Sequence, residues 1–189
     1  MNYFNQLKNI LLNIEVTDGK RRTMPLDKAI SKITGLIASL DRRTNKIIFI
    51  GNGGSASIAS HISTDFLKNA DVPAIAFNDA SLLTCLSNDL GYEHVFEKPV
   101  EMLSSAGDIL FAISSSGAST NILKAASRAM NNKCLAVTMS GFKPNNPLRG
   151  IGDINFYVPS HSYGYVEIAH LVVCHCIVDR VVEKKGRNG

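Results

Sequence analysis

Residues 46–65, KIIFIGNGGSASIASHISTD, decide the fold, because they read in succession as a strand, a glycine turn and a helix. The first five residues form an apolar, β-branched run, which is typical of a strand buried on both faces of a parallel sheet. Gly51, Gly53 and Gly54 then interrupt the run, and we expect Ser55 to cap the helix that follows. Free backbone amides and the positive end of the helix dipole would face the space above the strand, which predicts an anion site.

Four more short apolar segments follow, and they are predicted to be strands at residues 73–77, 108–113, 134–139 and 154–158. Segments with helical spacing lie between them, and a long helix at 165–184 closes the chain. This alternation predicts an α/β fold, a three-layer sandwich with a five-stranded parallel sheet. In such sheets ligands bind outside the carboxyl ends of the strands, near the point where the strand order reverses.

Two amphipathic helices are predicted ahead of the sheet, one at residues 4–16 and one that begins at Pro25. We therefore divide the chain into a helical extension at residues 1–45 and an α/β domain at residues 46–189. The apolar stripe of the second helix includes Ile33 and Ile37. These stripes could cover an edge of the sheet or pack against the same helices of another subunit. We expect the second arrangement, and hence a homo-oligomer.

The composition is that of a soluble globular protein, with 189 residues, of which 45% are hydrophobic and 19% are charged. No apolar run reaches the roughly 18 residues of a membrane span, and the N-terminus lacks the features of a signal peptide. Four cysteines without CxxC spacing suit reduced thiols, so we expect a cytoplasmic protein. The basic runs at 20–22 and 184–187 read as solvated ends, so we expect no nucleic-acid partner.

A serine turn at residues 114–119, SSSGAS, directly follows the strand predicted at 108–113 and opens a helix. Four hydroxyls beside free backbone amides can hold a phosphate group without a basic residue. Because this turn and the glycine turn both follow strands, we expect them to converge on one ligand. A plain connection with a single capping serine is the alternative. The glycine turn is not a dinucleotide fingerprint, since Ala56 stands where the third glycine is required.

Ionisable residues lie on two of the predicted helices. His61 and Asp65 are one turn apart and share a helix face, where they could hold a metal ion or a proton. Glu167, His170 and His175 interrupt the otherwise apolar closing helix, and buried ionisable groups need partners. Glu167 and His175 are separated by about 12 Å along the helix axis. One centre bound by both would need long side chains, or helices contributed by different subunits.

Together these motifs resemble the sugar isomerase (SIS) domain family and, within it, the phosphoheptose isomerases. The most specific matches are GNGGS with His61 and Asp65 behind it, SNDLGYEHVF at 87–96, the SxSGxS serine turn and the ExxH-x4-H pattern of the closing helix. The resemblance implies a flavodoxin-like fold and a cytoplasmic homotetramer. It also implies interconversion of sedoheptulose 7-phosphate and D-glycero-D-manno-heptose 7-phosphate through an enediolate, for the heptose of lipopolysaccharide or capsule.

The resemblance also implies roles for individual residues. Contacts to the phosphosugar fall on Asn52, Gly53, Gly54, Ser55, Asp65, Asn88, Asp89, Ser114, Ser115, Ser116, Ser119 and Glu167. The implied metal ligands are His61, Asp65, Glu167 and His175, with Asp65 as the catalytic base and His175 as the acid. Two imidazoles and two carboxylates suit one zinc ion, and the lack of a thiolate leaves nickel, manganese and cobalt as alternatives.

Two positions depart from the pattern of the family, which usually has Glu in place of Asp65 and Gln in place of Glu167. Both residues keep an oxygen ligand, but aspartate has a shorter reach and Glu167 adds a negative charge. One alternative function is a non-catalytic SIS regulator that binds a phosphosugar or a protein, and another is an isomerase of a different phosphosugar. Regulators of this kind lack the acidic residue and the final histidine, so Asp65 and His175 favour the enzyme.

Overall fold

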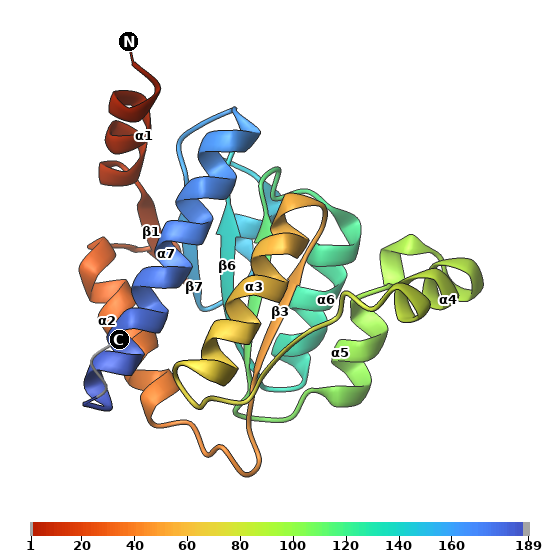
Figure 1. Ribbon diagram of the computed structural model, residues 1–189. Helices are drawn as coiled ribbons and strands as arrows, with labels where there is room; N and C mark the ends of the chain where they lie inside the picture. The colour runs from red at the N-terminus through yellow and green to blue at the C-terminus, as the bar shows by residue number, and fades with distance from the viewer. Residues whose placement is uncertain (1, 187–189) are drawn as a thin grey trace.

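The computed structural model describes residues 2–186 and contains a seven-stranded sheet with helices on both faces (Figure 1). The strands are β1 (Glu15–Asp18), β2 (Thr23–Met24), β3 (Ile47–Gly51), β4 (Ala74–Ala76), β5 (Ile109–Ser114), β6 (Leu135–Ser140) and β7 (Ile154–Tyr157). The helices are α1 (Tyr3–Leu12), α2 (Leu26–Ala38), α3 (Gly54–Lys68), α4 (Ala80–Leu90), α5 (Glu97–Leu103), α6 (Thr120–Asn131) and α7 (Tyr163–Lys184), with short 3-10 helices η1 (Tyr92–His94) and η2 (Pro147–Gly150).

All five predicted strands form, and they pair in parallel in the order β4-β3-β5-β6-β7. Every residue of β3 is buried, because successive side chains enter different cores on the two faces of the sheet. Ile47 and Phe49 join the core beneath α3 and α7, whereas Ile48 and Ile50 join the core beneath α5 and α6. The strand order reverses between β3 and β5, which places the switch point between the glycine turn and the serine turn.

The sheet has two strands more than predicted, because β1 and β2 extend it in antiparallel fashion beyond β7. The prediction of a helix as far as residue 16 is therefore wrong at its end, since α1 stops at Leu12. The pairing of Val16 with Phe156 explains the difference. It buries the β-branched Val16 and satisfies backbone groups at the edge of β7, which a longer helix could not do.

The two N-terminal helices differ in how much of their surface the rest of the chain buries. Helix α2 packs against α7, and Ile30, Ile33 and Ile37 of its apolar stripe are buried within the chain. For α2, the expectation that the stripe faces another subunit is thus wrong. Helix α1 instead projects beyond the sheet and buries none of its residues (Figure 1).

Helices α3 and α7 lie side by side on one face of the sheet, and α5 and α6 cover the other face (Figure 1). Helix α4 projects from the body and buries no residue. Among residues 2–186, no helix has the length and apolar character needed to cross a membrane. Arg187, in the basic run at 184–187, lies outside the described residues.

Candidate active site

The glycine turn (residues 51–55) and the serine turn (residues 114–119) meet in a cavity of about 270 Å³, which we call the turn pocket. Its wall contains all the substrate-contact residues predicted in the two turns, namely Asn52, Gly53, Gly54, Ser55, Ser114, Ser115, Ser116 and Ser119. The pocket lies outside the carboxyl ends of β3 and β5, on the two sides of the switch point. The two turns thus border one cavity, whereas their predicted contact with one ligand stays a prediction.

The glycine turn reverses the chain at Gly53, whose φ of 54° lies in the left-handed region that favours glycine. Helix α3 consequently begins at Gly54, and Gly53 is its N-cap residue. The prediction of Ser55 as the cap is wrong, because Ser55 lies inside the first turn and is buried. Gly54 has no side chain, and this lets the Glu167 carboxylate lie close to the backbone at the start of α3. A Cβ atom there would lie 2.5 Å from the carboxylate of Glu167 on α7.

The serine turn directs several hydroxyls toward the turn pocket. Ser114 Oγ lies 3.5 Å from Ser116 Oγ and 3.4 Å from Ser119 Oγ, and it accepts a hydrogen bond from the Gly117 amide over 3.2 Å. Ser119 is the N-cap residue of α6, but its side chain makes no capping hydrogen bond. Its hydroxyl therefore remains available to a ligand. A plain connection with one capping serine does not describe this turn.

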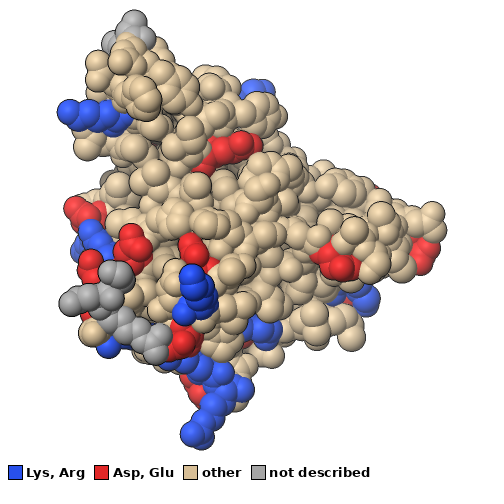
Figure 2. All heavy atoms as spheres, viewed as in Figure 1, with Lys and Arg blue, Asp and Glu red and all other residues tan. Residues whose placement is uncertain are grey.

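Among residues 2–186, no basic side chain contributes to the wall of the turn pocket, and its one carboxylate belongs to Glu167. On the face shown in Figure 2, most Lys and Arg side chains lie along the lower part of the molecule, away from the end at which α3 and α7 begin. An anion in the pocket would therefore be held by backbone amides, serine hydroxyls and the N-termini of α3 and α6.

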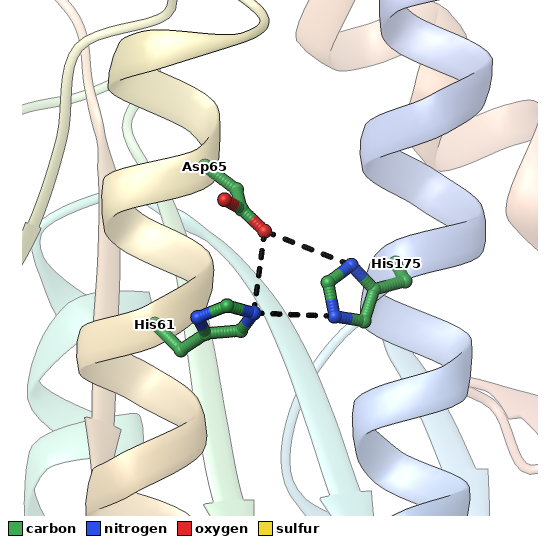
Figure 3. Close-up of side chains that lie close together, drawn as sticks. All are labelled: His61, Asp65 and His175. Atoms are coloured by element: carbon green, nitrogen blue, oxygen red, sulfur yellow. Dashed lines mark hydrogen bonds and ion pairs between the residues drawn. The ribbon is translucent and has the colours of Figure 1, made fainter. Parts of the chain in front are cut away.

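A second group of functional side chains lies farther along α3 and α7, and we call it the histidine cluster (His61, Asp65 and His175; Figure 3). His61 Nε2 is 3.3 Å from His175 Nε2 and 3.5 Å from Asp65 Oδ2. Asp65 Oδ2 is also 3.6 Å from His175 Nδ1. The Asp65 side chain is 18% exposed, and those of His61 and His175 are 54% and 40% exposed. The cluster is thus open to solvent on one side.

The histidine cluster fits a divalent cation. One ligand atom from each residue can be chosen so that all three lie within 4.8 Å of one another. Two nitrogens bound to one tetrahedral zinc ion are roughly 3.3 Å apart, because each Zn–N bond is about 2.0–2.1 Å long. Three protein ligands would leave a coordination position for water or substrate, as in catalytic rather than structural zinc sites.

The fourth predicted metal ligand, Glu167, lies elsewhere. It belongs to the wall of the turn pocket, where its carboxylate rests against Gly54, and it is not part of the three-residue metal group. This placement agrees with the separation of about 12 Å that helix geometry gives between Glu167 and His175. The structure thus brings together three of the four predicted ligands.

Asn88 and Asp89, two other predicted contacts, are located on the projecting helix α4 and do not line the turn pocket. Both side chains are exposed, and Asn88 Nδ2 donates to Asp89 Oδ1 over 2.7 Å. Asn88 borders a separate hollow that also includes Tyr92. The same segment still reaches the glycine turn, because the Tyr92 hydroxyl donates to Asn52 Oδ1 over 2.9 Å.

Tyr163 and Asn121 are site residues that sequence reasoning missed. Tyr163 lines the turn pocket because α7 begins two residues earlier than the predicted start at residue 165. Asn121 is buried behind the pocket and exchanges hydrogen bonds with Asn52. The available signal was the position of Asn121 in the first turn of the helix that the serine turn opens.

His170 lies on α7 between Glu167 and His175 but faces the sheet. Its ring is fully buried, and Nε2 is 3.1 Å from the carbonyl oxygen of Ser140 at the end of β6. Burial lowers the pKa of His170 to about 4, although the hydrogen bond to Ser140 opposes this shift. His170 is therefore neutral at physiological pH and belongs to the packing of α7 rather than to the histidine cluster.

Known proteins with the same organisation identify the family. Residues 2–141 match the model of the SIS domain family. A phosphoheptose isomerase of Shewanella sediminis is 36% identical over 82% of this chain and 83% of its own length. The structure superposes on phosphoheptose isomerases from Neisseria gonorrhoeae and Francisella tularensis, with TM-scores of 0.81 and 0.82 and identities of 26% and 27%. These alignments cover 95% and 96% of this chain and 95% of each of the other two. The chain therefore belongs to the SIS domain family and, within it, to the phosphoheptose isomerases.

Proposed function

We propose that this protein interconverts sedoheptulose 7-phosphate and D-glycero-D-manno-heptose 7-phosphate. The observation that carries the proposal is the placement of the turn pocket and the histidine cluster along the same two helices, α3 and α7. The first site can hold a phosphate group, and the second can move a proton. The relatives named as phosphoheptose isomerases support this choice of substrate.

The spacing of the two sites suits a long sugar phosphate. His61 follows Gly54 by seven residues on α3, and His175 follows Glu167 by eight residues on α7. The histidine cluster therefore lies about 10–12 Å beyond the turn pocket along both helices. In a heptose 7-phosphate, the phosphate group and the carbonyl group are at opposite ends of the carbon chain. A phosphate anchored by the serine turn would let the reacting end extend toward the cluster.

Aldose–ketose isomerisation needs a base that takes a proton from the carbon next to the carbonyl group and an acid that protonates the carbonyl oxygen. We assign the base to Asp65, whose Oδ2 points between the two imidazoles, and the acid to His175. The Oδ2 atom of Asp65 lies 3.6 Å from Nδ1 of the His175 ring. A divalent ion held by His61, Asp65 and His175, for which we propose zinc, would supply an electrophile that polarises the carbonyl oxygen.

We further propose a homotetramer assembled through the helices that the single chain leaves uncovered. Helix α1 buries no residue and exposes Tyr3, Phe4 and Leu12, and α4 likewise buries none. Such surfaces suit contact between identical subunits. Light scattering should show an oligomer that the paired substitutions Phe4→Asp and Leu12→Asp dissociate. Ile33 and Ile37 are unsuitable for this test because both are buried within the chain.

The proposed setting is the cytoplasm, with the product supplying heptose for lipopolysaccharide or capsule. Cys85, Cys134, Cys174 and Cys176 are all free thiols, which suits a reducing compartment. The identity of the relatives as phosphoheptose isomerases supports the use of the product as a heptose precursor.

The deciding experiment incubates the purified protein with sedoheptulose 7-phosphate, after treatment with a chelator and again after zinc is restored. We expect conversion to the aldose with zinc and a large loss of conversion in the chelated protein. Tight binding of the sugar phosphate without any conversion in the presence of zinc, nickel, manganese or cobalt would contradict the enzyme and favour a regulator.

A further inference from the structure

A pair of asparagine side chains, which we call the amide clasp (Asn52 and Asn121), joins the glycine turn to the helix that follows the serine turn. Asn52 Nδ2 donates to Asn121 Oδ1 over 3.0 Å, and Asn121 Nδ2 donates back to Asn52 Oδ1 over 3.0 Å. The two residues are 69 positions apart in the sequence. The clasp is therefore a tertiary link between the two halves of the turn pocket and not a local helix cap.

Two further donors complete the amide clasp. The Tyr92 hydroxyl donates to Asn52 Oδ1 over 2.9 Å, and the Ile122 amide donates to Asn121 Oδ1 over 2.9 Å. Each amide oxygen thus accepts two hydrogen bonds, which uses both of its lone pairs. The side chain of Asn52 keeps one N–H for a ligand in the turn pocket. The other N–H and the oxygen of this side chain form the hydrogen bonds that link the two sides of the turn pocket.

The position of the clasp gives it control over the gap between the two turns. The sheet joins β3 to β5 as far as the pair Gly51 and Ile113, and the two backbones separate after that point. The amide clasp links Asn52, the residue after Gly51, to Asn121 in the first turn of α6. Asn121 is only 3% exposed, so an amide that lost its partner there could not turn to water instead.

We propose that Asn121 and Tyr92 are positioning residues that set the width of the turn pocket by holding Asn52. The amides of the glycine turn and the hydroxyls of the serine turn can bind one phosphate group together only when the gap between them matches it. A clasp formed before binding spares the ligand the cost of ordering the two turns. The choice of a sugar phosphate as ligand rests on the proposed function, but the same gap governs the binding of inorganic phosphate.

The test measures the affinity for inorganic phosphate and the KM for sedoheptulose 7-phosphate in matched variants. Asn121→Ala should weaken phosphate binding and raise KM by about tenfold, and Tyr92→Phe by about two- to fivefold, with kcat less affected in both. The control is Asn132→Ala at the other end of α6, where the amide donates to Ser104 Oγ over 2.9 Å. This control should lower the melting temperature without changing the phosphate affinity.

A double-mutant cycle separates a clasp from two independent contacts. In an Asn52→Ala background, Asn121→Ala should add less than about twofold to the loss of phosphate affinity. Losses that multiply would overturn the proposal, as would unchanged phosphate affinity in folded Asn121→Ala and Tyr92→Phe proteins. If Asn121→Ala does not fold, Tyr92→Phe decides alone, because Tyr92 is 55% exposed and tolerates the change. A wild-type protein that binds phosphate but converts no heptose would refute the proposed function and leave this test intact.

Discussion

The turn pocket and the histidine cluster lie on the same two helices but are built in different ways. The pocket consists of backbone amides, glycines and serine hydroxyls in the turns that directly follow the buried strands β3 and β5. The cluster consists of three ionisable side chains that extend from α3 and α7 toward one another and are partly exposed to solvent. Under the proposed function, binding would depend on the backbone, whereas chemistry would depend on side-chain reach.

The difference implies that the two regions can be altered separately. A substitution in the histidine cluster removes a reactive group without moving the backbone of the turn pocket. A substitution in the pocket removes one of several hydrogen bonds to a phosphate group and leaves the reactive groups in place.

Asp65→Asn should give the largest effect, a fall in kcat of about two to four orders of magnitude, because it removes the proposed catalytic base. The affinity for inorganic phosphate should not change, since Asp65 lies about 10 Å or more from the turn pocket. Coupled assays and calorimetry measure the two quantities. The control is Asp65→Glu, which restores a carboxylate of greater reach and should retain activity. Equal losses of kcat and phosphate affinity in Asp65→Asn would show that the regions are not separable.

Acidification should destabilise the folded protein, because the pKa of His170, on helix α7, is about 4 in the folded state. An ordinary histidine has a pKa of about 6.5, so the unfolded chain takes up the proton first as the pH falls. The free energy of unfolding should therefore decrease between about pH 6.5 and pH 4, by about 3 kcal/mol for this group, and level off below pH 4.

Urea unfolding at a series of pH values measures the contribution of His170, with His170→Gln as the comparison because glutamine does not titrate. The stability difference between the two proteins should shrink as the pH falls through this range. A difference that stays constant with pH would show that His170 is not the group responsible.

Ser119→Ala should weaken the binding of phosphate and of the sugar phosphate by about 1–3 kcal/mol, the usual value of a hydrogen bond to a charged group. The helix should not lose stability through a missing cap, because the Ser119 side chain makes no capping bond. Titration with inorganic phosphate measures the loss, and Ser127→Ala, at an exposed position on the same helix, is the control. A lower melting temperature with unchanged phosphate affinity would assign Ser119 to the helix alone.

Glu167→Gln should have the smallest effect and the opposite sign. Glu167 supplies the one carboxylate in the wall of the turn pocket, so its neutralisation should strengthen phosphate binding by a few tenths to about 1 kcal/mol. Zinc affinity should stay the same, because Glu167 is not part of the histidine cluster. Zinc binding that falls tenfold or more on this substitution would instead make Glu167 a ligand in the assembled protein.

The parts of the fold that could be predicted from sequence are those set by local pattern. The strands β3 to β7 are short, mainly apolar segments, and the serine turn begins at the end of one of them. Strand β1 could not be found in this way, because Val16 continues the apolar spacing of α1 and a polar stretch begins directly after it. The strand conformation of residues 15–18 depends on pairing with β7, which is far away in the sequence.

The candidate site likewise has features that local sequence predicts and features that depend on tertiary packing. The glycine and serine turns were predictable because their composition has few other uses. The hydrogen-bond partner of Asn52 could not be predicted. A polar residue in the first turn of a helix is ordinarily solvated, and Asn121 is 69 positions away in the sequence. Helix geometry gave the spacing of Glu167 and His175, but only the packing of α3 against α7 shows that His61 and Asp65 meet His175 alone.

The two outermost strands have a consequence for how copies of this protein can associate. Strand β2 has two residues and β4 has three, so each border of the sheet offers few unpaired backbone groups. Borders this short make poor templates for adding strands from a neighbouring molecule, and Pro73 before β4 removes one more donor. The borders of the sheet therefore disfavour strand addition between copies, which leaves the surfaces made by helices for self-association.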